Sequence, residues 1–423
     1  MKKFFIKLTE KLIEGILFLS STVTTLAIVL ICIFLFKEGK KLFDHTPVEE
    51  GFVVAINKGN PVEKVSAAQI KKIYDQEITH WHDLSPNNFP KKQDAIDSLS
   101  EGPGEANPDS IILFRMDDIG NYFTEEDLGE NFEFIPQRIS ELIEKTPGII
   151  AFFSEKHIDK EKFHGKVLDI PEISLPKFIS EKEWFPTAQP AAQFGVLPLI
   201  LGTLWVSLGA ILIALPLGLA TAIYMAEIAN EKVRRVLKPL IELLAGIPSV
   251  VYGFFGLVIV VPQIQLLFNL PVGETALAGS IILGIMALPT IITISEDSLR
   301  TTPRTMKEAS LALGANKWQT IHRVVIPYSI SGITAASILG IGRAIGETMA
   351  VLMVTGNAAV IPHTLLEPVR TIPATIAAEL GEAPQGGLHF KALFALGCIL
   401  FIITMAINIS VELISSGKKY GKR

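Results

Sequence analysis

The sequence predicts an all-α polytopic membrane protein with six transmembrane helices and an inserted α/β domain outside the membrane. Two observations lead to this prediction. The 423 residues are 49% hydrophobic and only 19% charged, and the apolar residues gather in runs long enough to cross the roughly 30 Å hydrocarbon layer of a bilayer. Between the first two runs, residues 46–190 instead mix charged residues with short β-like runs and helical patterns.

The first apolar run, 15–36, is interpreted as a retained transmembrane anchor. Lysines precede it, as in a signal peptide, but the run is too long for a signal core. It ends in the lysines of 37–41 rather than at a small-residue cleavage site. We therefore expect three parts: an anchor over 1–45, the α/β domain over 46–190 and a membrane domain over 191–423.

The segment 46–190 has the size and the βα alternation of a small α/β domain. Gly, Pro, Asn and charged residues predict a loop over 85–110. The expected strands are 52–56, 111–115 and 148–153, and the expected helices are 67–74 and 135–145.

Five further apolar runs complete the predicted set of spans, and the basic residues between them orient the chain. The expected spans are 196–225, 237–262, 274–295, 329–355 and 391–415. Lys and Arg gather in 226–236, 296–328 and 416–423, whereas 263–273 holds none and 356–390 holds only Arg370. Under the positive-inside rule this pattern places both termini in the cytoplasm and 46–190 outside it.

The composition also excludes several classes of function. The net charge of −5 argues against a nucleic-acid partner. Cys32 and Cys398 fall inside apolar runs and are interpreted as small buried hydrophobic residues. His80 and His82 flank Trp81 without another ligand nearby in the sequence, so exposed loop histidines are favoured over a metal site. We expect neither a metal nor a cofactor.

The segment 296–328 predicts two short helices on the cytoplasmic side. Pro303 suits the first position of a helix, and Thr305 and Glu308 have the spacing of a capping box. Gly314 ends this helix, and a second helix over 317–325 stops at Pro327. A hairpin of this kind, polar on one side, is suited to docking on a cytosolic partner.

This loop closely resembles the EAA loop of the permeases of type I ABC importers. The resemblance rests on Glu308, Ala309 and Ser310, then Gly314, then the run Val324–Pro327. In that family the loop inserts into a groove of the ATPase, which implies an ATPase-coupling role for Glu308, Ala309, Ser310, Gly314 and Pro327. No G-x-x-x-x-G-K-[ST] motif occurs in the sequence, so the ATPase is expected to be a separate polypeptide and this chain is not expected to be an enzyme.

Two charges, Arg343 and Glu347, fall inside the fifth predicted span. Each costs about 2.5–3.5 kcal/mol at mid-bilayer, so both are expected to face a partner or a water-filled path. Their spacing would place them on one face of a helix, where they either line a path for an oxyanion or form a structural ion pair. Gly340, Gly342 and Gly346 permit the close approach of another helix.

The runs 340–357 and 246–253 resemble the phosphate-specific ABC permeases, in particular the PstC-like subunit. The resemblance covers about 196–415. We expect the translocation path to include Arg343, Glu347, Thr348 and Pro248. Pro248 and Gly253 are also expected to break or kink the third span and so to free backbone groups near the path. The resemblance implies four kinds of partner: membrane lipid, a PstA-like sister permease, a PstB-like cytosolic ATPase dimer and a PstS-like extracytoplasmic phosphate-binding protein. It also implies a multi-pass protein of the plasma (inner) membrane.

The α/β domain resembles one lobe of the phosphate-binding protein over 60–84 and 146–152. The place of the anion-binding turn in that family reads Arg115 to Asn121 here and contains Asp117 and Asp118, which would repel an anion. A docking or scaffolding role is therefore expected for this domain. Two alternatives stay open: a permease for another oxyanion such as sulfate or molybdate, and a membrane receptor that senses phosphate without transporting it.

Overall fold

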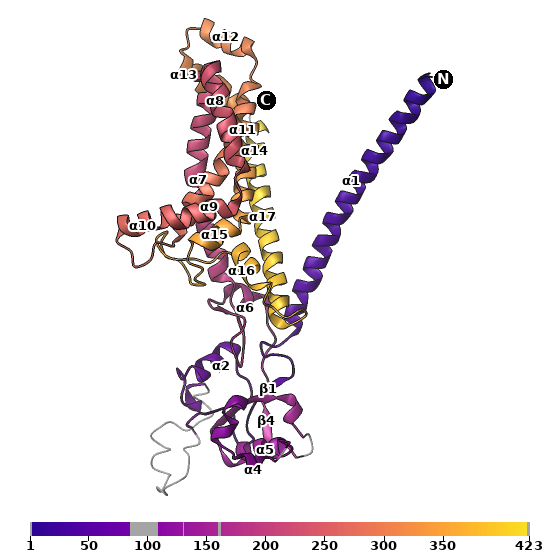
Figure 1. Ribbon diagram of the computed structural model, residues 1–423, viewed down its shortest axis with the longest axis vertical. Coiled ribbons are helices and arrows are strands. Elements are labelled where there is room, and N and C mark those ends of the chain that lie inside the picture. Colours follow the sequence, from indigo (N-terminus) through magenta and orange to yellow (C-terminus); the bar gives the residue numbers. More distant parts are fainter. Residues whose placement is uncertain (1, 85–108, 130, 160–161, 421–423) are drawn as a thin grey trace. The chain divides into compact units, whose positions relative to one another are not determined.

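The computed structural model describes residues 2–84, 109–129, 131–159 and 162–420. The chain divides into two compact units (Figure 1). A helical unit contains Met1–Gly39, Val196–Ala383 and Leu393–Arg423, and an α/β unit contains Lys40–Gly195 and Pro384–Ala392. The α/β unit is thus built mainly from the segment inserted between the first two apolar helices.

Among the described residues, six helical segments are long and apolar enough to cross a membrane: 11–44, 197–228, 249–268, 276–300, 317–346 and 388–413. This confirms the predicted all-α polytopic fold. Its helices are α1 (Lys2–Lys40), α7 (Leu197–Ile223), α8 (Glu231–Gly246), α9 (Ser249–Phe255), α10 (Val261–Phe268), α11 (Ala276–Arg300), α12 (Arg304–Ala312), α13 (Lys317–Thr320), α14 (Ile326–Gly346), α15 (Met349–Val354), α16 (Ile372–Glu379) and α17 (Leu388–Tyr420).

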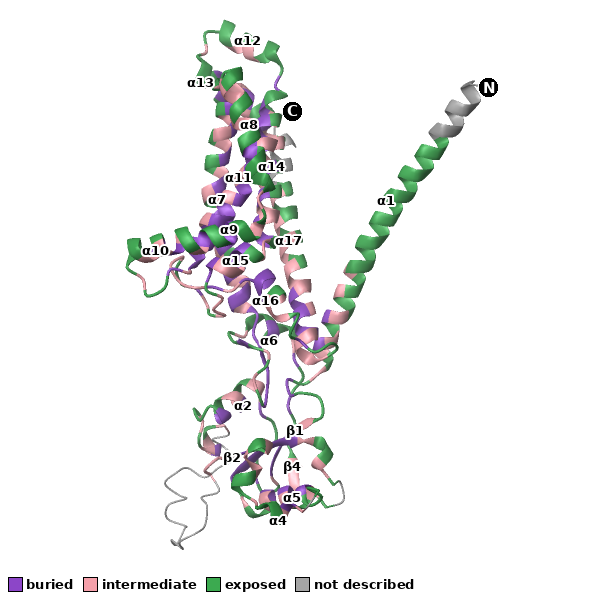
Figure 2. Ribbon diagram, viewed as in Figure 1, coloured by how far each residue is buried: buried purple, intermediate pink, exposed green. Residues whose placement is uncertain are grey.

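The centre of the helical unit is the contact between α7 and α11 (Figure 2). Small residues let the two backbones approach closely, as is common between membrane helices. A side chain at Gly209 would meet the Ser280 hydroxyl, and one at Gly218 would meet Ile291. Around this contact, buried residues of α7, α9, α10, α11, α14 and α15 form an apolar core.

The anchor helix α1 is exposed along the part whose side chains the structure describes, except near its end (Figure 2). There it meets α17 through edge-on ring pairs, Phe34 with Phe394 and Phe36 with Phe401. The Cys398 thiol also donates a hydrogen bond of 3.4 Å to the Leu35 carbonyl. A helix so apolar and so little covered by protein is suited to contact with lipid.

The third predicted span, 237–262, is wrong in its bounds, but the expected break at Pro248 is confirmed, whereas the helix continues through Gly253. The helix α8 ends at Gly246, and α9 begins at Ser249. Proline cannot donate the backbone hydrogen bond that a continuous helix would need there. The two helices also differ in direction, since α8 runs along the bundle while α9 and α10 run across it (Figure 1).

Three wide helical turns of the π type interrupt the helical unit. They are η5 (Tyr224–Ile228), η6 (Gly256–Val260) and η7 (Ile321–Val325). Such turns add one residue to a helix and are frequent at functional sites. One of them, η7, joins α13 to α14 and explains why Pro327 does not end the helix. The carbonyl that Pro327 would oppose in a regular helix belongs to Arg323, which lies inside the widened turn. The predicted stop at Pro327 is therefore wrong.

The α/β unit is built on a four-stranded sheet in the order β2-β3-β1-β4. Strands β2 and β3 are parallel, and β1 is antiparallel to both β3 and β4. The strands are β1 (Phe52–Asn57), β2 (Ile112–Arg115), β3 (Ile149–Ser154) and β4 (Gly165–Val167), with a separate pair of β5 (Trp184–Phe185) and β6 (Gln193–Phe194). The helices are α2 (Ala67–Tyr74), α4 (Glu125–Leu128), α5 (Ile135–Lys145) and α6 (Leu175–Ser180).

Side chains alternate across this sheet and bury both of its faces. Val54 and Ile56 of β1 pack with α2 and Trp81 on one face, and Ala55 packs with α5 on the other. The predicted helices 67–74 and 135–145 are confirmed with their bounds, and the predicted strands are confirmed to within a residue. The predicted loop over 85–110 lies almost entirely outside the described residues.

A buried lysine ties the start of α17 to the α/β unit. Lys391 Nζ lies 2.8 Å from His45 Nε2 and 3.1 Å from Glu50 Oε1. The hydrogen bond from Lys391 lowers the pKa of the Glu50 carboxyl. Because Lys391 is held by residues that follow α1, the short stretch Pro384–Ala392 belongs structurally to the inserted unit.

Candidate functional site

The predicted coupling loop is a short helix, α12, that offers almost all of its surface to solvent. None of its residues is buried, and Glu308 and Ala309 are exposed. Beyond its end Leu313 is 90% exposed, and Trp318 on α13 is 63% exposed. Exposed apolar residues on a polar helical hairpin are typical of a surface that a protein partner covers.

The predicted start of α12 is wrong in detail. Pro303 is the residue before the helix rather than its first residue, and the Thr305–Glu308 capping box is not formed, since the cap makes no side-chain hydrogen bond. Thr305 lies one position inside the helix, where its hydroxyl cannot reach the first free N–H groups. The second helix carries the capping box instead: Asn316 and Gln319 bond reciprocally at 2.8 Å.

Gly314 and Ser310 fix the turn between α12 and α13. Gly314 has a φ of +85°, a conformation that suits glycine, and it ends the helix as predicted. The Ser310 hydroxyl lies 3.0 Å from that of Thr320 and so ties the two helices together. The hairpin therefore has a defined shape although it lacks a buried core of its own.

Arg343 and Glu347 do not occupy one helix face, which corrects the prediction. The helix α14 ends at Gly346, and Glu347 has an extended backbone (ψ 135°). In the part of the chain that the structure describes, no ion pair or hydrogen bond joins Arg343 to Glu347. Arg343 is half-buried and lies within electrostatic reach of the Tyr252 hydroxyl, which itself donates to the Leu244 carbonyl at 2.7 Å.

The three glycines near the end of α14 differ in how closely another helix approaches them. A side chain at Gly340 would meet Ile291 of α11, so this glycine permits a close helix contact as predicted. Gly342 and Gly346 have no neighbour that a side chain would meet. The close approach of another helix that was expected at Gly342 and Gly346 is therefore not found among the described residues.

The break in the helix opens onto a cavity of about 500 Å³. Thr348, which starts α15 with a hydroxyl that donates to the Gly346 carbonyl at 3.3 Å, is on its wall. The other lining residues are Gly346, Pro373, Ile376, Ala377, Leu380, Gly381 and Leu400. The structure thus places Thr348 and the end of α14 on an open space between α14, α16 and α17.

Sequence reasoning missed the groups of buried charges in the helical unit. Arg370 and Glu379 form an ion pair of 2.8 Å at the two ends of α16. Glu296 on α11 is fully buried and lies 3.0 Å from Arg234, 3.1 Å from Lys238 and 3.4 Å from Arg300. For the Glu296 group, the signal in the sequence was two adjacent acidic residues, Glu296 and Asp297, at the end of an apolar run with basic residues on either side.

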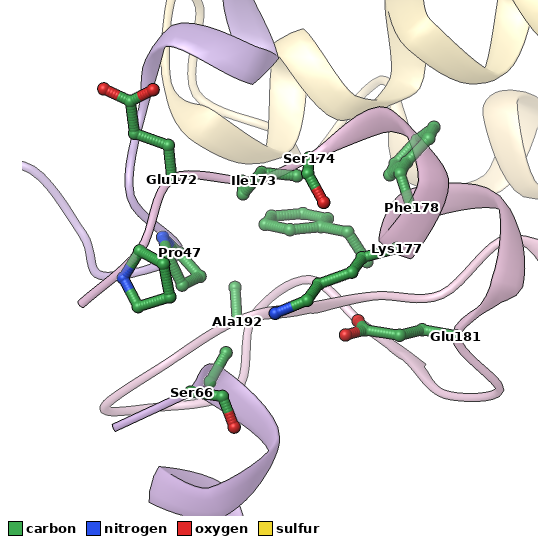
Figure 3. A pocket seen from close by; sticks show the side chains of 12 residues that line it. Pro47, Ser66, Glu172, Ile173, Ser174, Lys177, Phe178, Glu181 and Ala192 are labelled. Atoms are coloured by element: carbon green, nitrogen blue, oxygen red, sulfur yellow. The ribbon is translucent and has the colours of Figure 1, made fainter. Parts of the chain in front are cut away.

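The α/β unit offers little to hold an anion. Asp117 and Asp118 lie in η3 (Met116–Asn121), a short 3-10 helix that follows β2. The hydroxyl of Ser66, at the start of α2, is engaged by its own capping box with Gln69. A small cavity of about 40 Å³ lies beside Ser66, and Figure 3 shows Lys177 next to the acid Glu181 on its wall.

The two histidines that flank Trp81 have local partners. His82 bonds to Asp109 at 2.6 Å and to Asp83 at 3.0 Å, and His80 bonds to the Thr79 hydroxyl. Over the described residues, no group of three or more His, Cys, Asp or Glu side chains is arranged to hold a metal ion.

Two family models match the chain. Residues 214–420 match the binding-protein-dependent transport system inner membrane component, and residues 37–189 match a PBP superfamily domain. The probable ABC transporter permease protein YqgH of Bacillus subtilis is 40% identical over 247 residues, which cover 58% of this chain and 80% of that protein.

Two phosphate transport system permease proteins, both PstC, are also similar. The protein from Mesorhizobium japonicum is 41% identical, covering 54% of this chain and 75% of its own length. The protein from Pasteurella multocida is 36% identical, covering 58% of this chain and 82% of its own length.

Proposed function

Because the chain belongs to the family of binding-protein-dependent transport system inner membrane components, as a PstC-like ABC importer permease, we propose that it conducts inorganic phosphate. The observation that supports this most strongly is the exposed hairpin of α12 and α13. It holds Glu308, Ala309 and Gly314 on an exposed surface, with Ser310 half-buried in the turn, as docking on a separate ATPase requires. The PstC relatives are phosphate transport system permease proteins.

The proposed assembly has a PstA-like sister permease, a PstB-like cytosolic ATPase dimer and a PstS-like extracytoplasmic binding protein. In it both termini and the hairpin are cytoplasmic, and the inserted domain, 46–190, lies on the opposite side of the membrane. The distribution of Lys and Arg supports this orientation. Residues 191–423 form the permease domain. Its coupling loop is 296–328, and Pro327 lies near the end of this loop.

We propose that the phosphate path passes the break between α14 and α15. Arg343 offers a fork of donors that suits an oxyanion, and Thr348 offers a hydroxyl on the adjacent cavity. The negative charge of Glu347 weakens the binding of phosphate at this site, and weak binding lets the phosphate leave. Pro248 follows the end of one helix, α8, and frees backbone groups near the start of the next, α9.

A purified α/β domain, 46–190, is expected to bind no phosphate. Asp117 and Asp118 repel an anion at the place of the binding turn, and at the start of α2 the Ser66 hydroxyl already accepts from the Gln69 N–H group. Isothermal calorimetry with phosphate checks this, with circular dichroism to establish that the domain is folded. Binding at micromolar concentrations would contradict the docking role and would favour a phosphate sensor.

The partners are tested by affinity purification of the tagged full-length chain from its native membranes in mild detergent. Mass spectrometry should identify an ABC ATPase and a second permease in amounts comparable to the chain. Purification of the chain without an ATPase would contradict an importer subunit. A second cargo, sulfate or molybdate, is favoured if those anions compete with phosphate for uptake.

A further inference from the structure

We propose that Lys307 and Glu227 form the ionic link through which movement of the coupling helix α12 reaches the membrane helix α7, a role that rests on the proposed function. The two residues are far apart in the sequence and come from different helices. Lys307 is on α12, and Glu227 is in η5, the wide turn that ends α7. Their side chains form a short ion pair.

This ion pair is the one side-chain polar contact that α12 makes with the end of α7 in the described part of the chain. The other polar side-chain contact of α12, from Ser310, stays within the hairpin. Because α12 has no buried residue, apolar packing does not hold it firmly against the membrane helices. Through the backbone, α12 is joined to α11 and, by way of α13, to α14. The pair of Lys307 with Glu227 adds α7 to these connections.

Burial strengthens the link. The Glu227 side chain is 10% exposed and the Lys307 side chain 22% exposed, so the attraction is screened less than between surface charges. The wide turn η5 sets Glu227 beside an apolar cluster that includes Ala222, Leu299 and Val325. Removing one partner of an ion pair buried in this way is strongly destabilising.

A second group of ion pairs connects two further helices to those that the Lys307–Glu227 pair joins. Directly after η5, α8 begins, and its Arg234 and Lys238 both contact the buried Glu296 of α11. Helix α11 in turn runs into α12 through Thr301–Pro303. The ends of α7, α8, α11 and α12 are therefore joined in a ring by the chain and by two groups of ion pairs. Displacement of α12 by an ATPase would be transmitted to all four helices while Lys307 and Glu227 stay paired.

The test uses the full complex in proteoliposomes and measures phosphate taken up per ATP hydrolysed. Lys307→Gln and Glu227→Gln are each expected to lower this ratio at least about fivefold, the lower end of typical coupling between sites, with the ATPase still bound. Lys307→Arg keeps the charge and should retain most of the ratio. The exchange of both charges, Glu227→Lys with Lys307→Glu, should restore it. The control Lys232→Gln removes an exposed cation of α8 and should leave the ratio unchanged.

An unchanged ratio in Lys307→Gln would overturn the link. So would loss of the bound ATPase in Lys307→Gln, or failure of the exchanged pair to restore the ratio, since Lys307 would then act in docking or in folding alone. Absence of ATP-dependent uptake by the unmodified complex would instead contradict the proposed function, and this proposal with it.

Discussion

Replacing Arg343 by Gln is expected to lower phosphate uptake by about tenfold to a hundredfold while the complex stays assembled. Loss of a hydrogen bond between charged groups costs about 1.5–3 kcal/mol, and about 1.4 kcal/mol corresponds to a factor of ten in rate. The variant also keeps the negative charge of Glu347 on the proposed path while it removes the positive charge of Arg343. Uptake of radiolabelled phosphate into membrane vesicles measures the effect, and co-purified ATPase measures assembly.

The double variant Arg343→Gln with Glu347→Gln separates a path from a structural ion pair. A buried pair can often be replaced at little cost, so near-normal uptake in the double variant would show that the two residues only stabilise the fold. We expect uptake to stay low, because the structure describes no ion pair between them and Glu347 lies beyond the end of α14. Arg235→Gln, which removes an exposed arginine of α8, serves as the control and should transport normally.

Replacing Gly314 by Trp is expected to abolish coupling to the ATPase. Gly314 is exposed at the end of α12, so an indole there would occupy the docking surface itself. Its positive φ adds backbone strain of about 1–3 kcal/mol for most side chains. The chain should still insert into the membrane, whereas co-purified ATPase and ATP-driven uptake should both fall to background.

Two further variants refine this test: one separates the size of the side chain at position 314 from backbone strain, and the other changes only a surface charge. A side chain at Gly314 would meet no neighbouring atom in this chain, and Asn tolerates the left-handed conformation, so Gly314→Asn should keep most of the coupling. Glu308→Arg reverses an exposed charge on α12 without altering the backbone and should weaken ATPase association. Normal uptake in both Gly314→Trp and Glu308→Arg would contradict the coupling role of the loop.

The number of spans could be predicted because apolar runs of membrane length are a direct consequence of the bilayer. The break of the third span at Pro248 could be predicted as well, but not that α8 lies outside the span, which is 249–268. In 237–262 the apolar residues continue across Pro248, so hydrophobicity alone gives one helix, whereas α8 carries charges on one face and ends at Gly246. The charged residues Arg234 and Lys238 indicate an amphipathic helix at the surface of the helical unit. Their buried partner, Glu296, comes from another helix, α11.

Helix ends were the least predictable part of the candidate site. Arg343 and Glu347 have the spacing of a helical pair, yet Gly346 comes between them and α14 ends there. Thr305 and Glu308 likewise have capping spacing, but the helix begins one residue earlier, after Pro303. Spacing fixes which residues share a face only while the helix continues. The wide turn η7, which accommodates Pro327, has no recognised signature in the sequence.

The helices α2 and α5 of the inserted domain were predictable to the residue, because each combines a strong apolar stripe with a clear boundary. Ser66 and Gln69 form a capping box at the start of α2, and Thr146 follows α5 just before the next strand. The order of the strands was not predictable, since β1 pairs with β3 and β4 across long stretches of sequence. Only the packing of both sheet faces decides that order.

ATP-dependent uptake of phosphate by proteoliposomes is the most direct measurement of what this chain does. The vesicles would contain the chain with its co-purified ATPase and sister permease, and a phosphate-binding protein would be added outside. We predict accumulation of radiolabelled phosphate that requires ATP and is not displaced by a large excess of sulfate or molybdate. Equal accumulation without ATP, or accumulation of sulfate or molybdate in place of phosphate, would contradict a phosphate importer.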